Sequence, residues 1–311
     1  MVNRLLVAAA AALLLLLATA QPWLRFVLTI ALSTGLAVLG IMMLLRAGQV
    51  SFGHALYVAA GAYTVAFLRP HSGEALLLVL AGALVATGIG LLVGLFVTRY
   101  RDIFFGMLNL AFSMVAWSLL EKLYGLTRGT DGIRVARPEV AGLALEGPAY
   151  EWALLLLALA LALGAGGLVA RYLHTPAGEA LGAVKTRETR LEFAGISARR
   201  VLLQAYLVSA FLAGLGGAIA ALATLHVTPL LAYWTHSGEL VFVAILGGTG
   251  HVLGPFLGAV VFELVRVYAA ASFPDAWQMI LGLVLLGIIL AATRGLVGLV
   301  DDLLARFGRR A

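Results

Sequence analysis

The chain contains 311 residues, of which 62% are hydrophobic and only 12% are charged, and its mean hydropathy is +1.04. Soluble globular domains carry roughly 25% charged residues, so this composition excludes an ordinary soluble protein. The absence of cysteine from the sequence excludes disulfides, thiolate catalysis and zinc sites built from cysteine. The formal net charge of +6 is attributed to basic residues at membrane surfaces rather than to nucleic-acid binding.

Apolar runs recur along the chain, and several reach the length of about 20 residues that crosses a bilayer. We predict an all-α polytopic membrane protein with roughly 8 to 10 transmembrane helices, some of them broken or re-entrant. The N-terminal run has the basic and apolar regions of a signal peptide, but in a polytopic chain we interpret it as a retained first helix or signal anchor. The predicted spans are residues 5–20, 26–45, 54–68, 75–98, 103–122, 151–170, 201–224, 238–248 paired with 254–271, and 277–293.

The distribution of basic residues predicts the orientation of these spans. If the spans alternate, most basic clusters fall on one side, which the positive-inside rule assigns to the cytoplasm together with both termini. The segment 123–150 then forms an extracytoplasmic loop. It carries three arginines of its own, but the rule weakens as loops lengthen. The clusters on the cytoplasmic side are Arg4, Arg46, Arg99 with Arg101, the island 171–200, and Arg306, Arg309 and Arg310.

Two segments interrupt the apolar pattern with glycine, proline and polar residues. Residues 45–54 read LRAGQVSFGH, and residues 247–255 read GGTGHVLGP. Glycine and proline end helices, and broken backbone at membrane depth is tolerated only where protein or a water-filled cavity satisfies it. Paired interruptions in two halves of a membrane protein indicate a substrate pathway and a weak internal repeat. The glycine-rich residues 213–218 instead predict a close helix-packing face.

Several stretches, in the same order along the chain, share one family's pattern. They are AGQVSFGHALYVAAGAYTVAFL from residue 47, GLTRGTDGI at 125–133, GEALGAVKTRETRLEFAGI at 178–196, AYLVSAFLAGLGGAIAAL at 205–222 and ILGGTGHVLGPFLGA at 245–259. Together they resemble the LivM-type permeases of branched-chain amino acid ABC transporters. Val50 and Phe52 depart from the family pattern, but both substitutions keep the apolar character.

The resemblance implies that residues 1–311 form a single transmembrane permease domain, a multi-pass subunit of an ATP-driven importer in the cell inner membrane. The implied partners are a second related permease, two cytoplasmic ATP-binding subunits, an extracytoplasmic substrate-binding protein and the lipid bilayer. Branched-chain amino acids are the family's usual solutes. Permeases for urea, short amides or aromatic acids are the alternative within the family, and a secondary transporter or channel that acts alone is the alternative outside it.

The island 171–200 is charged and helix-prone. Thr175 and Pro176 are typical of a helix start, and Gly195 is typical of a helix end. Composition leaves two interpretations open, a coupling helix seated on an ATPase or a solvated connector, and the resemblance favours the first. The residues assigned to ATPase coupling are Thr175, Pro176, Glu179, Lys185, Arg187, Glu188, Glu192, Ala194, Gly195 and Ile196.

No enzymatic chemistry is expected in this chain. A P-loop needs glycine directly before its lysine, and neither Lys122 nor Lys185 follows a glycine, so ATP hydrolysis is expected on a partner. The six histidines have no H-x-x-H or HExxH spacing, and no metal or other cofactor is predicted. An intramembrane enzyme would need paired acids or a His–Glu pair at depth, which the pattern lacks.

The two interruptions supply the candidate translocation pathway. A helix that starts after the first one points free backbone N–H groups toward the break, which suits a carboxylate or a polar solute. Close helix packing at the glycines is the alternative interpretation. The assigned residues are Gly48, Gln49, Ser51, Gly53, His54, Gly247, Gly248, Gly250, Gly254 and Pro255.

Overall fold

The computed structural model describes residues 2–291 and 295–298 and is almost entirely helical. Helices form along the apolar runs because a helix satisfies its own backbone hydrogen bonds where no water is available. The chain is therefore an all-α polytopic membrane protein, as predicted. Six of the described helices are long and apolar enough to cross a membrane: α2 (Pro22–Arg46), α4 (Ala75–Val97), α5 (Asp102–Lys122), α7 (Gly147–Leu173), α9 (Ala198–Thr224) and α11 (Gly254–Ser272).

Shorter apolar helices accompany these six. Two of them, α3 (His54–Leu68) and α10 (Trp234–Gly247), flank the interruptions and have 15 and 14 residues. At about 1.5 Å per residue each reaches only about 22 Å, less than the roughly 30 Å of a hydrocarbon core. Both have the length of half-helices, which was expected of residues 238–248 but not of 54–68, which was predicted as a span. The remaining two are α1 (Val2–Ala20) and α12 (Trp277–Ala291).

Some predicted features lie outside the described residues. The last predicted span was 277–293, and its final two residues, 292 and 293, belong to this group. The predicted cytoplasmic cluster of Arg306, Arg309 and Arg310 lies outside the described residues as well.

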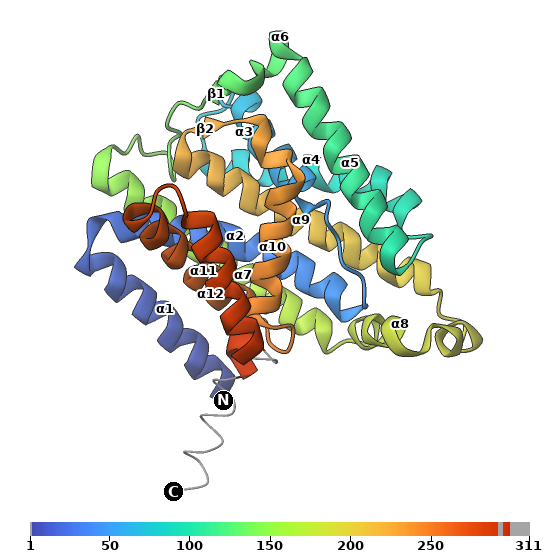
Figure 1. The fold of residues 1–311 in the computed structure, drawn as a ribbon. Coiled ribbons are helices and arrows are strands. Elements are labelled where there is room, and N and C mark those ends of the chain that lie inside the picture. The colour runs from blue at the N-terminus through green and yellow to red at the C-terminus, as the bar shows by residue number, and fades with distance from the viewer. Residues whose placement is uncertain (1, 292–294, 299–311) are drawn as a thin grey trace, which may run out of the picture.

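Short elements gather at one end of the helix bundle (Figure 1). An antiparallel pair of strands there joins the segment after α5 to the segment after α9, with Ile133 opposite Val227 and Arg134 opposite His226. The sequence did not predict these strands, because two residues show no alternation. The elements are α6 (Tyr124–Thr127), η1 (Gly129–Asp131), β1 (Ile133–Arg134), β2 (His226–Val227) and η2 (Pro229–Ala232).

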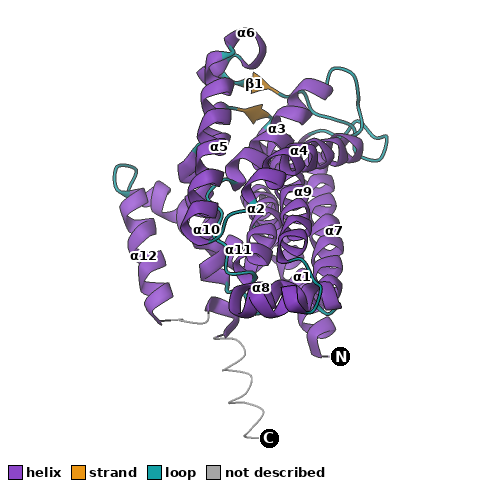
Figure 2. Ribbon diagram, turned by 90° about the vertical axis from the view of Figure 1, so that its right-hand side faces the viewer, coloured by secondary structure: helices purple, strands orange, loops and turns teal. Residues whose placement is uncertain are grey.

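At the opposite end, α8 (Pro176–Phe193) lies across the bundle (Figure 2). Its helix signals work as predicted: the Thr175 side chain accepts a hydrogen bond from the Gly178 N–H at 3.4 Å. Gly195, with φ of +77°, takes the left-handed conformation just after the helix ends. The beginning of α1 lies at this same end, here named the α8 end (Figure 1).

The centre of the bundle is formed by α2 and α9, whose apolar stretches are the most buried of the six long helices. Glycines bring backbones together there, as residues 213–218 predicted. A Cβ on Gly217 would overlap the carbonyl oxygen of Val58 in α3. A Cβ on Gly216 would overlap the carbonyl oxygen of Ser33 in α2, so only the hydrogen atom of glycine fits there. The rigid centre positions both interruptions.

Candidate functional site

The first interruption, residues 47–53, is an extended segment that follows the first turns of α5. Gln49 Oε1 accepts a hydrogen bond from the Asp102 N–H at 2.9 Å, at the start of α5. Further along, a Cβ on Gly53 would lie 2.5 Å from the carbonyl oxygen of Asn109, so only glycine fits. The segment thus runs along α5 from its first residue, Asp102, to Asn109, about two helical turns or roughly 10 Å into the bundle.

His54, the first residue of α3, joins this segment to the central helix α9. Its ring is fully buried. Nδ1 lies 3.0 Å from Ser51 Oγ, and Nε2 lies 2.5 Å from Ser209 Oγ. A neutral imidazole donates one hydrogen bond and accepts one, and serine hydroxyls can serve either role. Both ring nitrogens therefore have partners, and the histidine fixes the segment in place.

The N-terminal end of α3 also meets α10. The Ala55 N–H donates to Ser237 Oγ at 2.9 Å, so a side chain from the first turn of α10 satisfies one of the free amides of α3. Just before α10, the carbonyl oxygen of Ala232 accepts a hydrogen bond from Ser113 Oγ in the middle of α5, at 2.8 Å. The chain after β2 therefore re-enters the bundle, and α10 begins at the depth of the middle of α5.

The second interruption lies between α10 and α11, and glycine again permits the geometry. Gly248 has φ of +87°, and a Cβ on Gly247 would overlap the carbonyl group of Gly254. The turn is held by the last residue of α2: Arg46 Nε donates to the Thr249 carbonyl oxygen at 3.0 Å, and its Nη2 to that of Gly250 at 2.8 Å.

These contacts place the first interruption alongside α10, and the chain direction of the interruption is antiparallel to that of the helix. Arg46 meets Thr249, two residues beyond the end of α10, and Ala55 meets the first turn of α10. The ten helical steps from Ser237 to Gly247 cover about 15 Å, and the five extended residues 49–53 cover about 16 Å, so the lengths agree.

The predicted pathway residues therefore fall into two groups that meet at Arg46. In the described chain, Gln49, Ser51 and His54 are at most 4% exposed, so these residues line no open path in this conformation. The first group is Gly48, Gln49, Ser51, Gly53 and His54, and the second is Gly247, Gly248, Gly250, Gly254 and Pro255.

Sequence reasoning missed a second buried polar cluster beside His54. Tyr206 donates a hydrogen bond to Asn109 Oδ1, and the hydroxyls of Tyr57 and Tyr206 are 2.6 Å apart. Since the hydroxyl hydrogen of Tyr206 is used on Asn109, Tyr57 is the donor in that pair. The signal was present, because polar residues inside apolar spans are costly and need partners.

The transverse helix α8 contacts the first interruption. The stem of Lys185 packs on Gly48, where a Cβ would lie 2.9 Å from Lys185 Cγ. Glu188 forms a bidentate ion pair with Arg101. Arg101 Nε donates to Glu188 Oε2 at 3.1 Å, and Arg101 Nη2 donates to Glu188 Oε1 at 2.7 Å. Arg101 directly precedes Asp102, whose amide Gln49 binds. Two coupling residues are thus connected to pathway residues.

The other residues that the sequence assigned to ATPase coupling lie on α8 and just after it, some at the start of the helix and most on exposed surface. Leu181 and Val184 are buried on the bundle side of α8. In contrast, the side chains of Phe193 and Ile196 are 88% and 41% exposed in the isolated chain. Exposed with them are Glu179, Glu192, Ala194 and Gly195, while Thr175 and Pro176 form the helix start. The side chain of Arg187 lies outside the described part of the structure.

Within residues 2–291 and 295–298, no three histidine or acidic side chains come together in a way that would hold a metal ion. What the arrangement offers is a helix at one end, connected through two side chains to a buried, extended segment between half-helices.

Comparison with known proteins gives the family. The model of the branched-chain amino acid transport system / permease component family matches residues 23–289. Among curated relatives are the high-affinity branched-chain amino acid transport system permease proteins LivM of Escherichia coli (strain K12) and Salmonella typhimurium, each 28% identical over 242 residues. The similarity covers 70% of this chain but 57% of each relative's length. No solved structure matches. Because the family model spans most of the sequence, the chain belongs to the branched-chain amino acid transport permease family.

Proposed function

We propose that this chain is a membrane subunit of an ATP-driven importer that carries branched-chain amino acids, or a related small polar solute, into the cell. It would work with a second related permease, two cytoplasmic ATP-binding subunits and an extracytoplasmic substrate-binding protein. Support comes from the family match and from the two LivM relatives, which are named as branched-chain amino acid permeases. In this proposal the membrane is the cell inner membrane, the α8 end faces the cytoplasm and the β1–β2 end faces outward.

The observation that carries the proposal is the connection between α8 and the first interruption. An ATPase that moves α8 would move Glu188, and with it Arg101 at the start of α5. Asp102 follows, and its amide is bound by Gln49 in the extended segment. A solvated connector would need none of these contacts.

The extended segment is suited to transmit such a movement. It has no helical hydrogen bonds of its own, and its conformation depends on α5, α9 and α10. A displacement of α5 relative to α9 would separate Asn109 from Tyr206, because these two side chains belong to those two helices. In the proposal, this separation opens the closed pathway beside His54.

The partner-facing surface of α8 gives the experiment. Phe193 is 88% exposed at the end of α8, so Phe193→Asp removes no contact within the described chain. In the reconstituted transporter, we expect this variant to lose most of the ATP hydrolysis that solute and binding protein stimulate. Phe193→Leu is the matched control, because it keeps an apolar side chain at the same exposed position.

Two results would defeat the proposal. Wild-type stimulation of ATP hydrolysis in Phe193→Asp would remove the coupling role of α8. Leucine uptake into liposomes that contain this chain without ATP-binding subunits would instead identify a transporter that acts alone.

A further inference from the structure

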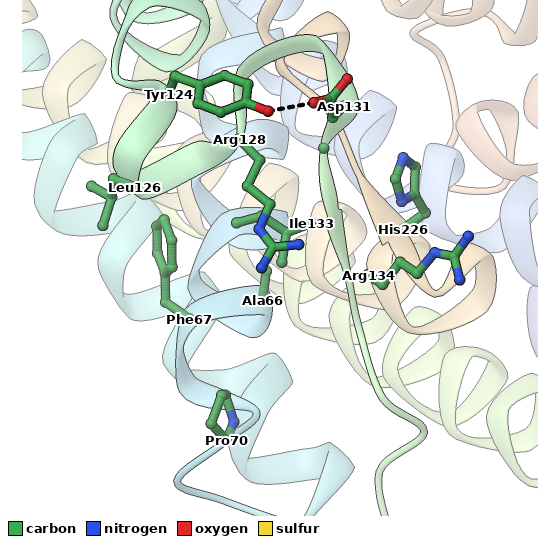
Figure 3. A pocket seen from close by; sticks show the side chains of 11 residues that line it. Ala66, Phe67, Pro70, Tyr124, Leu126, Arg128, Asp131, Ile133, Arg134 and His226 are labelled. Atoms are coloured by element: carbon green, nitrogen blue, oxygen red, sulfur yellow. Dashed lines mark hydrogen bonds between the residues drawn. The ribbon is translucent and has the colours of Figure 1, made fainter.

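A cavity of about 610 Å³ opens at the β1–β2 end of the bundle, away from both interruptions. It lies between the last turn of α3, α6, η1 and the two strands (Figure 3). This volume is in the range of small-molecule sites, which are about 300–1,000 Å³. Neither the coupling helix nor the pathway residues contribute to its lining.

The cavity carries charges of both signs at its rim. Arg128 extends from the end of α6 toward Ala66 and Phe67, and the Tyr124–Asp131 pair lies above it (Figure 3). Tyr124 donates to Asp131 Oδ2 at 2.6 Å. This hydrogen bond raises the pKa of Tyr124, so the tyrosine keeps its proton and remains a donor.

Arg128 and Asp131 are close in the chain but are not paired with each other, and Arg134 adds a third charged side chain to the lining. Among the described residues, no carboxylate oxygen lies within 4.0 Å of the Arg128 guanidinium. Asp131 uses one oxygen for Tyr124, and none of its described hydrogen bonds occupies the other. A ligand that brings one negative and one positive group would fit between them. Guanidinium binds carboxylate with two parallel hydrogen bonds, and a carboxylate accepts from an ammonium.

The lower wall is apolar. It is formed by four side chains from α3, α6 and β1, so a hydrocarbon group on the ligand would be taken out of water there, at about 25 cal/mol per Å² of apolar surface. Phe67 and Leu126 are 37% and 61% exposed in the unliganded chain, which leaves this wall accessible. The four residues are Ala66, Phe67, Leu126 and Ile133.

We propose that this cavity is an outer binding site for a zwitterionic α-amino acid with an aliphatic side chain: Arg128 binds the carboxylate, Asp131 binds the ammonium group, and Phe67, Leu126 and Ile133 contact the side chain. The inference rests on the proposed import function and names its substrate class. Urea and short amides carry neither charge, and an aromatic acid without an amino group leaves Asp131 without a ligand.

The location gives this site a role in the transport direction. Ala66 and Phe67 belong to the last turn of α3, and His54 and Ala55 form its first turn beside the closed pathway. One rigid helix of 15 residues therefore connects the cavity to the first interruption. The amino acid is held at this outer site before the segment at the other end of α3 opens.

The test measures binding of L-leucine to the full-length chain in lipid nanodiscs, without binding protein. We expect saturable binding that Arg128→Gln weakens at least about tenfold and Asp131→Asn several-fold, because each removes one charge-assisted contact. Arg137→Gln is the matched control: it removes the same charge from the same loop, but Arg137 lies outside the cavity and over the Tyr150 ring. L-Leucine should be displaced by L-isoleucine and L-valine, but not by urea, acetamide or 4-methylpentanoate.

Several outcomes overturn the site. They are the absence of saturable leucine binding, equal loss in Arg128→Gln and Arg137→Gln, and displacement by urea as strong as by valine. If Arg128→Gln weakens only the association with the binding protein, the cavity is a protein-docking surface and the proposal fails. ATP-driven leucine uptake distinguishes failure of this site from failure of the import function. Unchanged uptake in Arg128→Gln rejects the site and leaves the import function standing. Absence of uptake by the wild-type complex rejects the import function.

Discussion

Arg101 holds Glu188 with two hydrogen bonds, 3.1 Å from Nε to Oε2 and 2.7 Å from Nη2 to Oε1. The pair joins the turn between α4 and α5 to the middle of α8, across 87 positions of sequence. Arg101 also donates to the carbonyl oxygens of Thr98 and Tyr100, so its guanidinium is fixed on the α5 side. Glu188 is then the residue that attaches the transverse helix to this fixed point.

Exchanging the two charges tests this attachment. Glu188→Arg places two cations together and should reduce solute-stimulated ATP hydrolysis several-fold in the reconstituted transporter. Arg101→Glu with Glu188→Arg should recover part of it, since the exchanged pair re-forms but loses the contacts to Thr98 and Tyr100. A double-mutant cycle on stability should give about 1 kcal/mol, because both side chains are partly exposed. Additive losses with no recovery would show that the pair does not attach α8.

The tyrosine pair beside His54 predicts an asymmetry between two similar substitutions. Tyr57→Phe removes one donor and leaves Tyr206 bound to Asn109, at a cost of about 1 kcal/mol. Tyr206→Phe leaves both Tyr57 and Asn109 without their partner, at a cost of about 1–3 kcal/mol for each buried group left unsatisfied. Unfolding measured in detergent should therefore rank Tyr206→Phe as clearly less stable.

The reversed order of these two variants would contradict the assigned donors. A control is Tyr124→Phe, whose hydroxyl is exposed and bonds only Asp131 among the described residues. Its stability should remain within about 0.5 kcal/mol of wild type, as for most surface changes.

The sequence predicted the helices well because an apolar run long enough to cross a bilayer has few alternatives to a helix. Thr175 and Gly195 likewise marked the ends of α8, because capping and positive φ depend on local chemistry. Pairing across the bundle was not predictable in this way. Ser209 lies 155 positions from His54, and Asn109 lies 97 positions from Tyr206. A single sequence carries no signal for such distances beyond the presence of a polar residue in an apolar helix.

The two interruptions show the same difference between local features, which the sequence predicts, and contacts between distant segments, which it does not. Glycine and proline identified both breaks, and the short run 238–248 indicated the half-helix α10, whereas α3 was predicted as a span. That the first break extends along α5 and α10 depends on Gln49 reaching Asp102 and on Ser237 reaching Ala55, which are contacts between distant segments. Phe193 is 88% exposed in the isolated chain, and hydrophobicity alone does not say which subunit covers such a side chain.

Helix packing at the centre predicts different outcomes for two glycine-to-alanine changes. Gly217→Ala would push a methyl group into the carbonyl of Val58 and should destabilise the chain by about 1–3 kcal/mol. Gly88→Ala, in α4, meets nothing within 4 Å and should be neutral or stabilising by up to about 1 kcal/mol. Thermal unfolding of the two variants checks this, and equal melting temperatures would contradict the close approach of α3 and α9.

The last prediction concerns the contact between the two breaks. Arg46 is the residue of α2 that donates to the Thr249 and Gly250 carbonyl oxygens, and a lysine lacks the planar fork that fits both at once. Arg46→Lys should raise hydrogen exchange at amides 248–254 moderately, and Arg46→Ala should raise it strongly, because the turn then keeps only its own backbone bonds.

Arg69 offers the matched control, since it binds the carbonyl oxygens of Ala136 and Arg137 in the same manner at the opposite end. Arg69→Ala should accelerate exchange at amides 135–137 and leave 248–254 unchanged, and Arg46→Ala should do the reverse. If both variants accelerate both regions, the effect is a general loss of stability and the contact at Arg46 has no separate role. If exchange at 248–254 is unchanged in Arg46→Ala, the second break holds its conformation without the first, and the movement proposed for one cannot pass to the other through Arg46.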